Sequence, residues 1–103
     1  MSNETEGFAM RITKYGHACL LLEEGSARIL IDPGAFSQGF EELTGLTAVL
    51  LTHQHMDHVQ AKTLKPLLDQ NADAKLYADA DTTAMLAKEG IEVQNFIWFI
   101  LIY

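Results

Sequence analysis

Three histidines and one aspartate lie within six residues of this chain, at His53, His55, Asp57 and His58. They directly follow the apolar run Ala48–Leu51, which is typical of a strand covered on both faces. Imidazole nitrogens and carboxylate oxygens are side-chain groups that bind zinc and similar divalent ions. Because they are concentrated on a loop that leaves a buried strand, a metal site is the leading interpretation.

The spacing of these side chains allows them to share metal ions. His53 and His55 are two residues apart, so both rings can point to one side and bind one ion at about 2.0–2.1 Å. Asp57 and His58 are adjacent, and they can face a second ion if the loop turns into a helix. The alternative is a polar surface loop with incidental histidines or a purification-like metal affinity. Four histidines in 103 residues rarely give such a cluster by chance, which favours the metal site.

The first half of the chain shows strand patterns separated by turn residues. The expected elements are a half-buried strand over residues 8–15, an apolar strand over 18–22, a hairpin turn at 23–26, a returning strand over 28–31 that stops at 32–34, and a loop over 35–47 with a helical turn around 40–43.

The second half alternates strands with helices. The expected elements are a strand over 48–52, a helix over 61–71 in which Pro66 must sit early or break it, a strand over 75–78, a helix from the N-cap Asp81 to Lys88 with Gly90 as its C′ residue, and a strand that begins over 91–93. This order predicts an α/β layered domain. Ligands of such domains bind at loops that leave the carboxyl ends of strands, where the histidine loop lies.

Composition excludes several classes of protein. The net charge is −7, from 14 acidic and 7 basic residues, which argues against a nucleic-acid-binding protein. Cys19 is the single cysteine, so no intrachain disulfide can form, and residues 1–7 are too polar for a signal peptide. The apolar run at 96–103 is shorter than the about 20 residues of a membrane span. We therefore expect a cytoplasmic chain.

Three segments together carry a resemblance to a known family. Residues 52–58 (THQHMDH), 15–22 (YGHACLLL) and 29–33 (ILIDP) resemble the metallo-β-lactamase-fold superfamily. Within it they are similar to small cytoplasmic metal-dependent hydrolases related to ascorbate-phosphate lactonases and to the N-acyl-phosphatidylethanolamine phospholipase D type. The resemblance covers about residues 10–93. It implies the N-terminal half of an αββα sandwich, with a β-hairpin start and then β–loop–α–β–α–β.

The resemblance also implies roles for the side chains. His53 and His55 match ligands of a first metal ion, and Asp57 and His58 match ligands of a second. Asp57 would also act in catalysis by orienting the bridging hydroxide. Asp32 matches a carboxylate that ends an early strand and braces the metal loop by hydrogen bonds. From the residues alone, Asp32 is a turn-forming aspartate before proline, and both roles can hold together.

The implied activity is hydrolysis by a metal-activated hydroxide of a small-molecule ester, lactone, amide or phosphodiester. Zinc is the expected cofactor, as one or two ions, with manganese, iron or nickel as alternatives. His17 matches a histidine near the mouth of the site, where it would contact substrate. The alternative for His17 is a hydrogen-bonded structural histidine. Cys19 lies in an apolar strand, and we expect it in the core.

The chain departs from the family pattern after residue 93. The family domain is about twice as long, and its second half supplies further histidine and aspartate ligands. Residues 59–103 contain no histidine, and Asp69, Asp73, Asp79 and Asp81 are expected at helix ends or turns. We therefore expect residues 1–103 to form one truncated metallo-hydrolase domain with an atypical apolar tail at 94–103. That tail is either a buried strand or a truncated or frameshifted end.

Three hypotheses follow for the activity of the chain. The first is an enzyme that hydrolyses its substrate at the metal site. The second is a truncated, non-catalytic fragment that binds metal weakly or not at all and associates with itself, for which the uncharged apolar tail offers a pairing segment. The third is a complete site formed between two chains.

Overall fold

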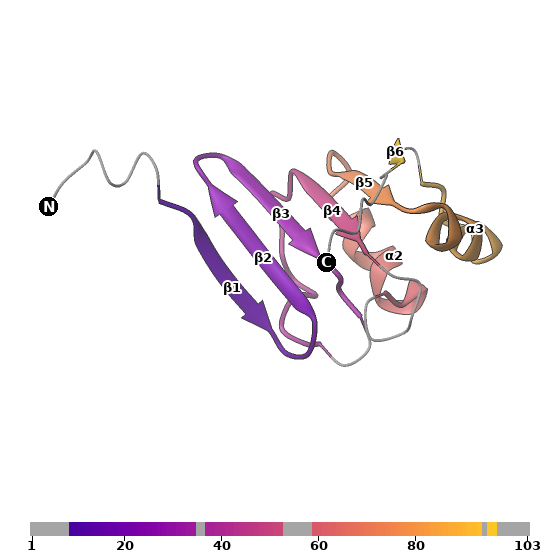
Figure 1. The fold of residues 1–103 in the computed structure, drawn as a ribbon, viewed down its shortest axis with the longest axis horizontal. Helices are drawn as coiled ribbons and strands as arrows, with labels where there is room; N and C mark the ends of the chain where they lie inside the picture. The colour runs from indigo at the N-terminus through magenta and orange to yellow at the C-terminus, as the bar shows by residue number, and fades with distance from the viewer. Residues whose placement is uncertain (1–8, 35–36, 53–58, 94, 97–103) are drawn as a thin grey trace, which may run out of the picture.

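The computed structural model describes residues 9–34, 37–52, 59–93 and 95–96, which contain a single mixed sheet and two helices (Figure 1). The strands, in sheet order, are β1 (Arg11–Tyr15), β2 (Cys19–Glu24), β3 (Ala27–Ile31), β4 (Ala48–Leu51), β5 (Lys75–Ala78) and β6 (Asn95–Phe96). The helices are α2 (Ala61–Asp69) and α3 (Ala80–Lys88). The predicted α/β class and the predicted order of elements are confirmed.

The strand directions define two borders of the sheet, one at each end of the strands. β2 pairs antiparallel with β1 and with β3, whereas β3–β4, β4–β5 and β5–β6 are parallel pairs. Among the described strands, β2 alone therefore runs opposite to the others (Figure 1). The segments that leave β1, β3, β4 and β5 meet at one edge, which we call the carboxyl edge. The opposite side, where these strands begin, is the amino edge.

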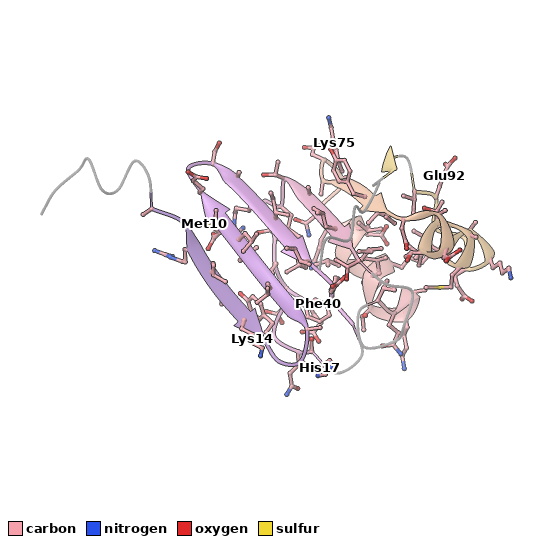
Figure 2. The ribbon with its side chains drawn as sticks, in the orientation of Figure 1. Met10, Lys14, His17, Phe40, Lys75 and Glu92 are labelled. Atoms are coloured by element: carbon pink, nitrogen blue, oxygen red, sulfur yellow. The ribbon has the colours of Figure 1, made fainter. Side chains whose placement is uncertain are left out.

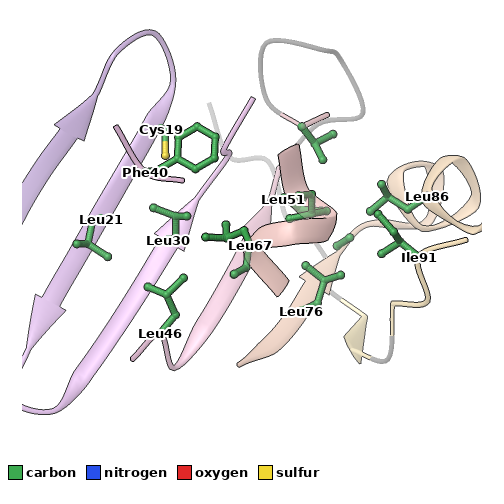
Figure 3. Packing of buried hydrophobic residues seen from close by; sticks show 14 residues of the cluster. Cys19, Leu21, Leu30, Phe40, Leu46, Leu51, Leu67, Leu76, Leu86 and Ile91 are labelled. Carbon is green, nitrogen blue, oxygen red and sulfur yellow. The ribbon is translucent and has the colours of Figure 1, made fainter. Parts of the chain in front are cut away.

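One face of the sheet packs against both helices. Leu64 and Leu67 of α2 and Leu86 of α3 belong to the same buried cluster as side chains of β2, β3, β4 and β5 (Figure 3). Its members are Cys19, Leu21, Leu30, Phe40, Leu46, Val49, Leu51, Val59, Leu64, Leu67, Leu76, Ala78, Leu86 and Ile91. Burial of this apolar surface is the main driving force that holds the helices on the sheet.

The hairpin of β2 and β3 has strands that are longer at the turn than the sequence indicates. Glu24 pairs with Ala27, so the turn consists of Gly25 and Ser26 rather than residues 23–26. Gly25 has a φ of 59°, which glycine adopts without the steric cost of a side chain. The ladder of β2 and β3 thus continues up to a two-residue turn. β1 begins at Arg11, whereas the expected strand began at residue 8.

Pro66 lies inside α2, which contradicts the expectation that it must sit early in the helix or break it. A proline at this position cannot donate a hydrogen bond to the carbonyl of Lys62. Lys62 and Pro66 are both exposed, so water can bond that carbonyl. The buried Leu64 and Leu67 hold the opposite side of the helix against the sheet. Packing therefore outweighs the loss of one helical hydrogen bond.

The N-cap of α3 is Asp79 and not the predicted Asp81. The Asp79 carboxylate accepts the Thr82 N–H at 3.0 Å, and Asp81 lies in the first turn. The predicted end of the helix is confirmed, because Gly90 has a φ of 81° and donates its N–H to Ala87. The Ile91 N–H reaches the carbonyl of Leu86 at 2.9 Å, which completes a Schellman motif.

The last described strand begins later than expected. Residues 91–93 are not in a strand, and β6 comprises Asn95–Phe96, which pair with β5. Ile91 is instead buried beside Leu86 in the core as part of the helix end. Neither described helix is long and apolar enough to cross a membrane.

Candidate metal centre

The carboxyl edge gathers polar side chains from four segments of the chain. His17 lies in the turn after β1, Asp32 directly follows β3, Thr52 directly follows β4, and Asp79 directly follows β5. Figure 2 shows His17 at this edge, with Met10 at the opposite end of β1. Loops at the carboxyl ends of parallel strands are where α/β proteins bind their ligands.

Asp32 and Thr52 form the tightest polar contact at this edge. One carboxylate oxygen of Asp32 accepts the Thr52 N–H at 2.7 Å, and the other accepts the Thr52 hydroxyl at 2.5 Å. Asp32 is 4% exposed. Both acceptor oxygens of a buried carboxylate are thus directed at one residue, the residue that immediately precedes His53. Hydrogen bonds to a charged group are about twice as strong as neutral ones.

The backbone of Asp32 is unusual for its position in the chain. Its φ is 53°, in the left-handed region, and it is the one non-glycine residue with positive φ among those that the structure describes. Pro33 follows it, and a residue before proline favours extended backbone. Such strain costs on the order of 1–3 kcal/mol and persists when neighbouring contacts compensate. Here the Asp32 N–H also donates to the Leu50 carbonyl at 2.9 Å.

The predicted metal ligands His53, His55, Asp57 and His58 lie outside the described residues. The residues on both sides of residues 53–58 are described. Thr52 is bonded to Asp32, and Val59 is 2% exposed within the buried cluster. Both attachment points of the histidine segment are therefore anchored, one by a polar contact and one by apolar packing.

His17 is exposed, in the turn of residues 16–18 between β1 and β2. The hydroxyl oxygen of Ser37 accepts the N–H groups of Ala18 and Cys19, each at 3.3 Å. Ser37 is 6% exposed, and it thereby ties the loop before β4 to the turn that carries His17. Sequence reasoning did not identify this role of Ser37, because its contacts join segments that are far apart in the chain.

Cys19 lies in the core, as predicted, with no exposed surface. Burial, together with the negative charges of Asp32 and Glu41, raises the pKa of its thiol to about 12. The thiolate is the nucleophile and the metal ligand among the forms of cysteine. Cys19 is therefore an apolar packing residue and neither a nucleophile nor a ligand.

The remaining aspartates occupy the positions expected of them. Asp69 ends α2, Asp73 lies in the following turn, and Asp79 and Asp81 begin α3. Within the part of the chain that the structure describes, no group of three or more His, Cys, Asp or Glu side chains could hold a metal ion. The predicted ligands in residues 53–58 lie outside that part of the chain.

One surface depression of the described residues lies away from these polar groups. It has a volume of about 590 Å³ and is lined by Ala9, Met10, Arg11, Glu23 and Gly25, at the amino edge. These side chains come from one hairpin and offer one carboxylate beside one guanidinium. We therefore assign the candidate site to the carboxyl edge from its chemistry and not from the shape of the surface.

Comparison with known proteins identifies the class of this fold and site. The family model of the beta-lactamase superfamily domain matches residues 11–99. This chain belongs to that family, and the predicted metallo-β-lactamase fold is confirmed. The match extends beyond residue 93, where we expected the resemblance to end, and it includes β6.

Individual relatives agree with the family match. The chain is 53% identical over 79 residues to Protein Rv0786c of Mycobacterium tuberculosis, covering 77% of this chain and 37% of that protein. It is 39% identical over 89 residues to the UPF0173 metal-dependent hydrolase Atu1317 of Agrobacterium fabrum, covering 80% of this chain and 37% of that protein.

A solved structure supports the fold. A crystal structure described as a metal-dependent hydrolase from Parabacteroides distasonis has a TM-score of 0.66 at 24% identity, covering 82% of this chain and 37% of that one. The chain thus spans well under half the length of the relatives that it matches. That share fits the predicted N-terminal half of the αββα domain.

Proposed function

We infer that this chain carries the metal-binding loop of a metal-dependent hydrolase, with His53, His55, Asp57 and His58 as the ligands. The observation that supports the proposal is the Asp32–Thr52 contact, in which a strained, buried carboxylate fixes the residue that precedes the histidine segment. A metal loop has to be held in place because its ligands act only in the correct geometry. The relatives named as metal-dependent hydrolases are in line with it.

The donor set fits zinc better than a hard cation. Three imidazoles and one carboxylate suit zinc, and they also suit iron, manganese or nickel, whereas magnesium and calcium prefer oxygen ligands. His53 and His55 would hold one ion, and Asp57 with His58 a second. Such ions lower the pKa of water toward neutrality and polarise the reacting oxygen of a substrate.

The other side chains of the carboxyl edge would position the loop and the substrate. Asp32 fixes the position of Thr52 and with it the start of the loop. Asp57 would orient the attacking water through its carboxylate, and His17 is exposed at the same edge, where it would contact the substrate. The substrate class that we propose is a small ester, lactone, amide or phosphodiester, and the location is the cytoplasm.

Metal content and hydrolysis test the proposal together. We expect near-stoichiometric zinc by mass spectrometry after dialysis, and loss of this zinc in the His53→Ala, His55→Ala double variant. The His17→Ala variant is the matched control, because it removes an exposed histidine outside the ligand set and should keep the zinc. Hydrolysis of p-nitrophenyl acetate and of bis-p-nitrophenyl phosphate then reports turnover. Absence of both zinc and turnover would contradict the proposal.

A second candidate function is a metal-binding chain without turnover. It is favoured by the absence of histidine from residues 59–103. Tight zinc that depends on His53 and His55, with no hydrolysis of either substrate, would support this candidate. Hydrolysis that rises with the square of chain concentration would instead support a site that two chains complete.

A further inference from the structure

The turn that carries His17 is held by a buried side chain from another part of the chain. This turn, residues 16–18, lies between β1 and β2 and outside the ladder that pairs them; we call it the His17 turn. The Ser37 hydroxyl oxygen accepts the N–H groups of Ala18 and Cys19, each at 3.3 Å. Ser37 is 6% exposed, so water does not readily replace it as the acceptor. The position of the His17 turn therefore depends on one hydroxyl group.

Ser37 is also connected to the residue that supports the proposed metal loop. Its backbone N–H donates to the carbonyl of Gly34 at 3.2 Å, and the Gly34 N–H donates to the carbonyl of Asp32 at 2.9 Å. The Asp32 carboxylate in turn accepts two hydrogen bonds from Thr52. A continuous series of hydrogen bonds thus runs from Thr52 to the His17 turn and relates the positions of these two parts of the carboxyl edge.

Apolar packing holds the loop of Ser37 independently of its hydroxyl. Phe40 has no exposed surface and belongs to the buried cluster (Figure 3). Gly39, with a φ of 94°, lies so close to the Tyr15 ring that a Cβ at this position would be 3.2 Å from the ring Cδ1 atom. Removal of the Ser37 hydroxyl should therefore leave the loop in place and release the His17 turn alone.

We propose that Ser37 is a positioning residue that holds the His17 turn, and with it the imidazole, where the substrate binds. The inference rests on the proposed function and deepens it, because it adds a residue that affects substrate binding without touching the substrate. Ser37 is buried, so it acts through His17. A displacement of about 1 Å can remove most of the contribution of a contact, so the hydroxyl that fixes this turn determines substrate affinity.

A purely structural role of Ser37 makes a different prediction. A buried donor that loses its acceptor lowers stability whether or not a substrate binds, so stability alone does not distinguish the two roles. Positioning of His17 predicts a rise in KM in addition, because a contact made equally in the ground state and the transition state changes KM and leaves kcat unchanged. It also predicts that removal of His17 abolishes the effect of Ser37.

The test measures KM and kcat of the zinc-loaded chain with p-nitrophenyl acetate and bis-p-nitrophenyl phosphate. We expect Ser37→Ala to raise KM about three- to tenfold, the size of one lost polar contact, and to change kcat less than about twofold. Ser37→Thr keeps the hydroxyl and should restore KM. Ser26→Ala is the matched control, because it makes the same change at an exposed serine of the β2–β3 turn, at the amino edge.

A double-mutant cycle tests whether Ser37 acts through His17. His17→Ala should raise KM by a similar factor, and Ser37→Ala should add less than about twofold in the His17→Ala background. Amide hydrogen exchange provides a readout that needs neither metal nor substrate. In Ser37→Ala the amides of Ala18 and Cys19 should exchange faster, whereas the amide of Leu21, within the β1–β2 ladder, should not.

The results that would overturn the inference differ from those that would overturn the proposed function. An unchanged KM in Ser37→Ala, with faster exchange at Ala18 and Cys19, would leave Ser37 with a structural role only. Fully additive effects of Ser37→Ala and His17→Ala on KM would show that Ser37 does not act through His17. Bound zinc without turnover would contradict this inference and leave the metal loop, whereas a parent with neither zinc nor turnover would contradict both.

Circular dichroism of each variant confirms that it is folded. If Ser37→Ala is not, Ser37→Cys in a reducing buffer decides, because cysteine is close to serine in volume but accepts hydrogen bonds only weakly. It should raise KM in the same direction, and a KM equal to that of the parent would contradict the inference.

Discussion

Two buried polar side chains, Asn71 and Asp32, hold opposite edges of the same sheet. Asn71 is 5% exposed and lies near the amino ends of β4 and β5, and Asp32 is 4% exposed at the carboxyl edge. Asn71 accepts the Leu46 N–H at 3.1 Å and donates to the carbonyls of Leu43 at 2.8 Å and Leu67 at 2.9 Å. It thus joins the loop before β4 to the end of α2 through neutral hydrogen bonds.

Asp32 uses its side chain differently at the other edge. Both carboxylate oxygens bond to Thr52, and its backbone adopts a left-handed φ before a proline. A neutral amide that joins a loop to the end of a helix contributes to the fold alone. Asp32 is instead a charged group on a strained backbone, and it is bonded to the one residue that precedes the histidine segment. This arrangement is more costly than the fold requires. Equal burial therefore does not mean an equal role.

The largest expected effect is on the stability of the amino edge. Replacing Asn71 with alanine removes the side-chain partner of the Leu46 N–H and of the Leu67 carbonyl, and leaves the Leu43 carbonyl with only the Gln70 amide at 3.4 Å. We expect this loss to cost about 3 kcal/mol in the free energy of unfolding. Gln70→Ala is the matched control, because Gln70 is the exposed neighbouring amide and should cost below about 1 kcal/mol. Urea unfolding followed by circular dichroism measures both. Similar losses would show that Asn71 does not hold this edge.

Asp32 accepts two hydrogen bonds from Thr52, and variants of the Thr52 hydroxyl distinguish their contributions to stability. Thr52→Val keeps the N–H bond and the side-chain volume but removes the hydroxyl donor, at an expected cost of about 1.5 kcal/mol. Thr52→Ser keeps the donor and should recover most of that loss. The same unfolding assay compares the two variants. If serine and valine were equally destabilising, the methyl group and not the hydrogen bond would be what matters at this position.

Variants of Asp79 test whether this second carboxylate at the carboxyl edge has a purely structural role. Asp79→Ala removes the N-cap of α3 and should cost about 1 kcal/mol, whereas Asp81→Ala should cost a few tenths. Neither change should alter zinc content. Thermal unfolding and metal analysis of the same samples provide both results, and zinc loss in Asp79→Ala would add this residue to the site.

The last expected effect, which appears only at alkaline pH, is the response of Cys19. Its folded pKa of about 12 lies above the ordinary value of 9.0, so folding favours the protonated thiol. The resulting stabilisation is complete below pH 9 and is lost as pH rises from 9 toward 12. Stability measured between pH 8 and 10.5 should fall less in Cys19→Ser than in the parent. The thiol should also resist Ellman's reagent until the chain unfolds, and fast labelling of the folded chain would contradict this.

The sequence predicts the type and order of the helices and strands better than the residues at which they begin and end. Apolar runs such as β4 and the turn residues between them give the order of strands and helices, because burial requires those patterns. The sequence predicts Asp81 as the N-cap of α3, whereas Asp79 caps the helix. Aspartate suits a cap at either position, and only the location of the free N–H groups in the first turn of the helix distinguishes the two. Pro66 and the late start of β6 likewise depend on packing that local sequence does not encode.

The candidate site was predictable in its ligand types, and the family resemblance also predicted Asp32 as a residue that supports the metal loop. The His-x-His-x-Asp-His pattern indicates metal chemistry from residue types alone, and it stays a prediction because residues 53–58 lie outside the described residues. From the residues alone, Asp32 before Pro33 gave no sign of a left-handed backbone or of Thr52 as its partner 20 positions away. Ser37 was missed for the same reason. Contacts between distant segments come from topology, and residue spacing does not specify topology.

The zinc affinities of the parent, of Asp32→Asn and of Asn71→Ala test the central claim most directly. Each protein is titrated with zinc under conditions in which circular dichroism shows that all three are folded. Asp32→Asn keeps an acceptor for the Thr52 N–H but loses the charge. Because supporting residues typically contribute 10- to 100-fold to metal affinity, we expect a loss of about that size in Asp32→Asn and a change below about twofold in Asn71→Ala. Unchanged affinity in Asp32→Asn, or an equal loss in both variants, would contradict the assignment of the carboxyl edge as the support of a metal loop.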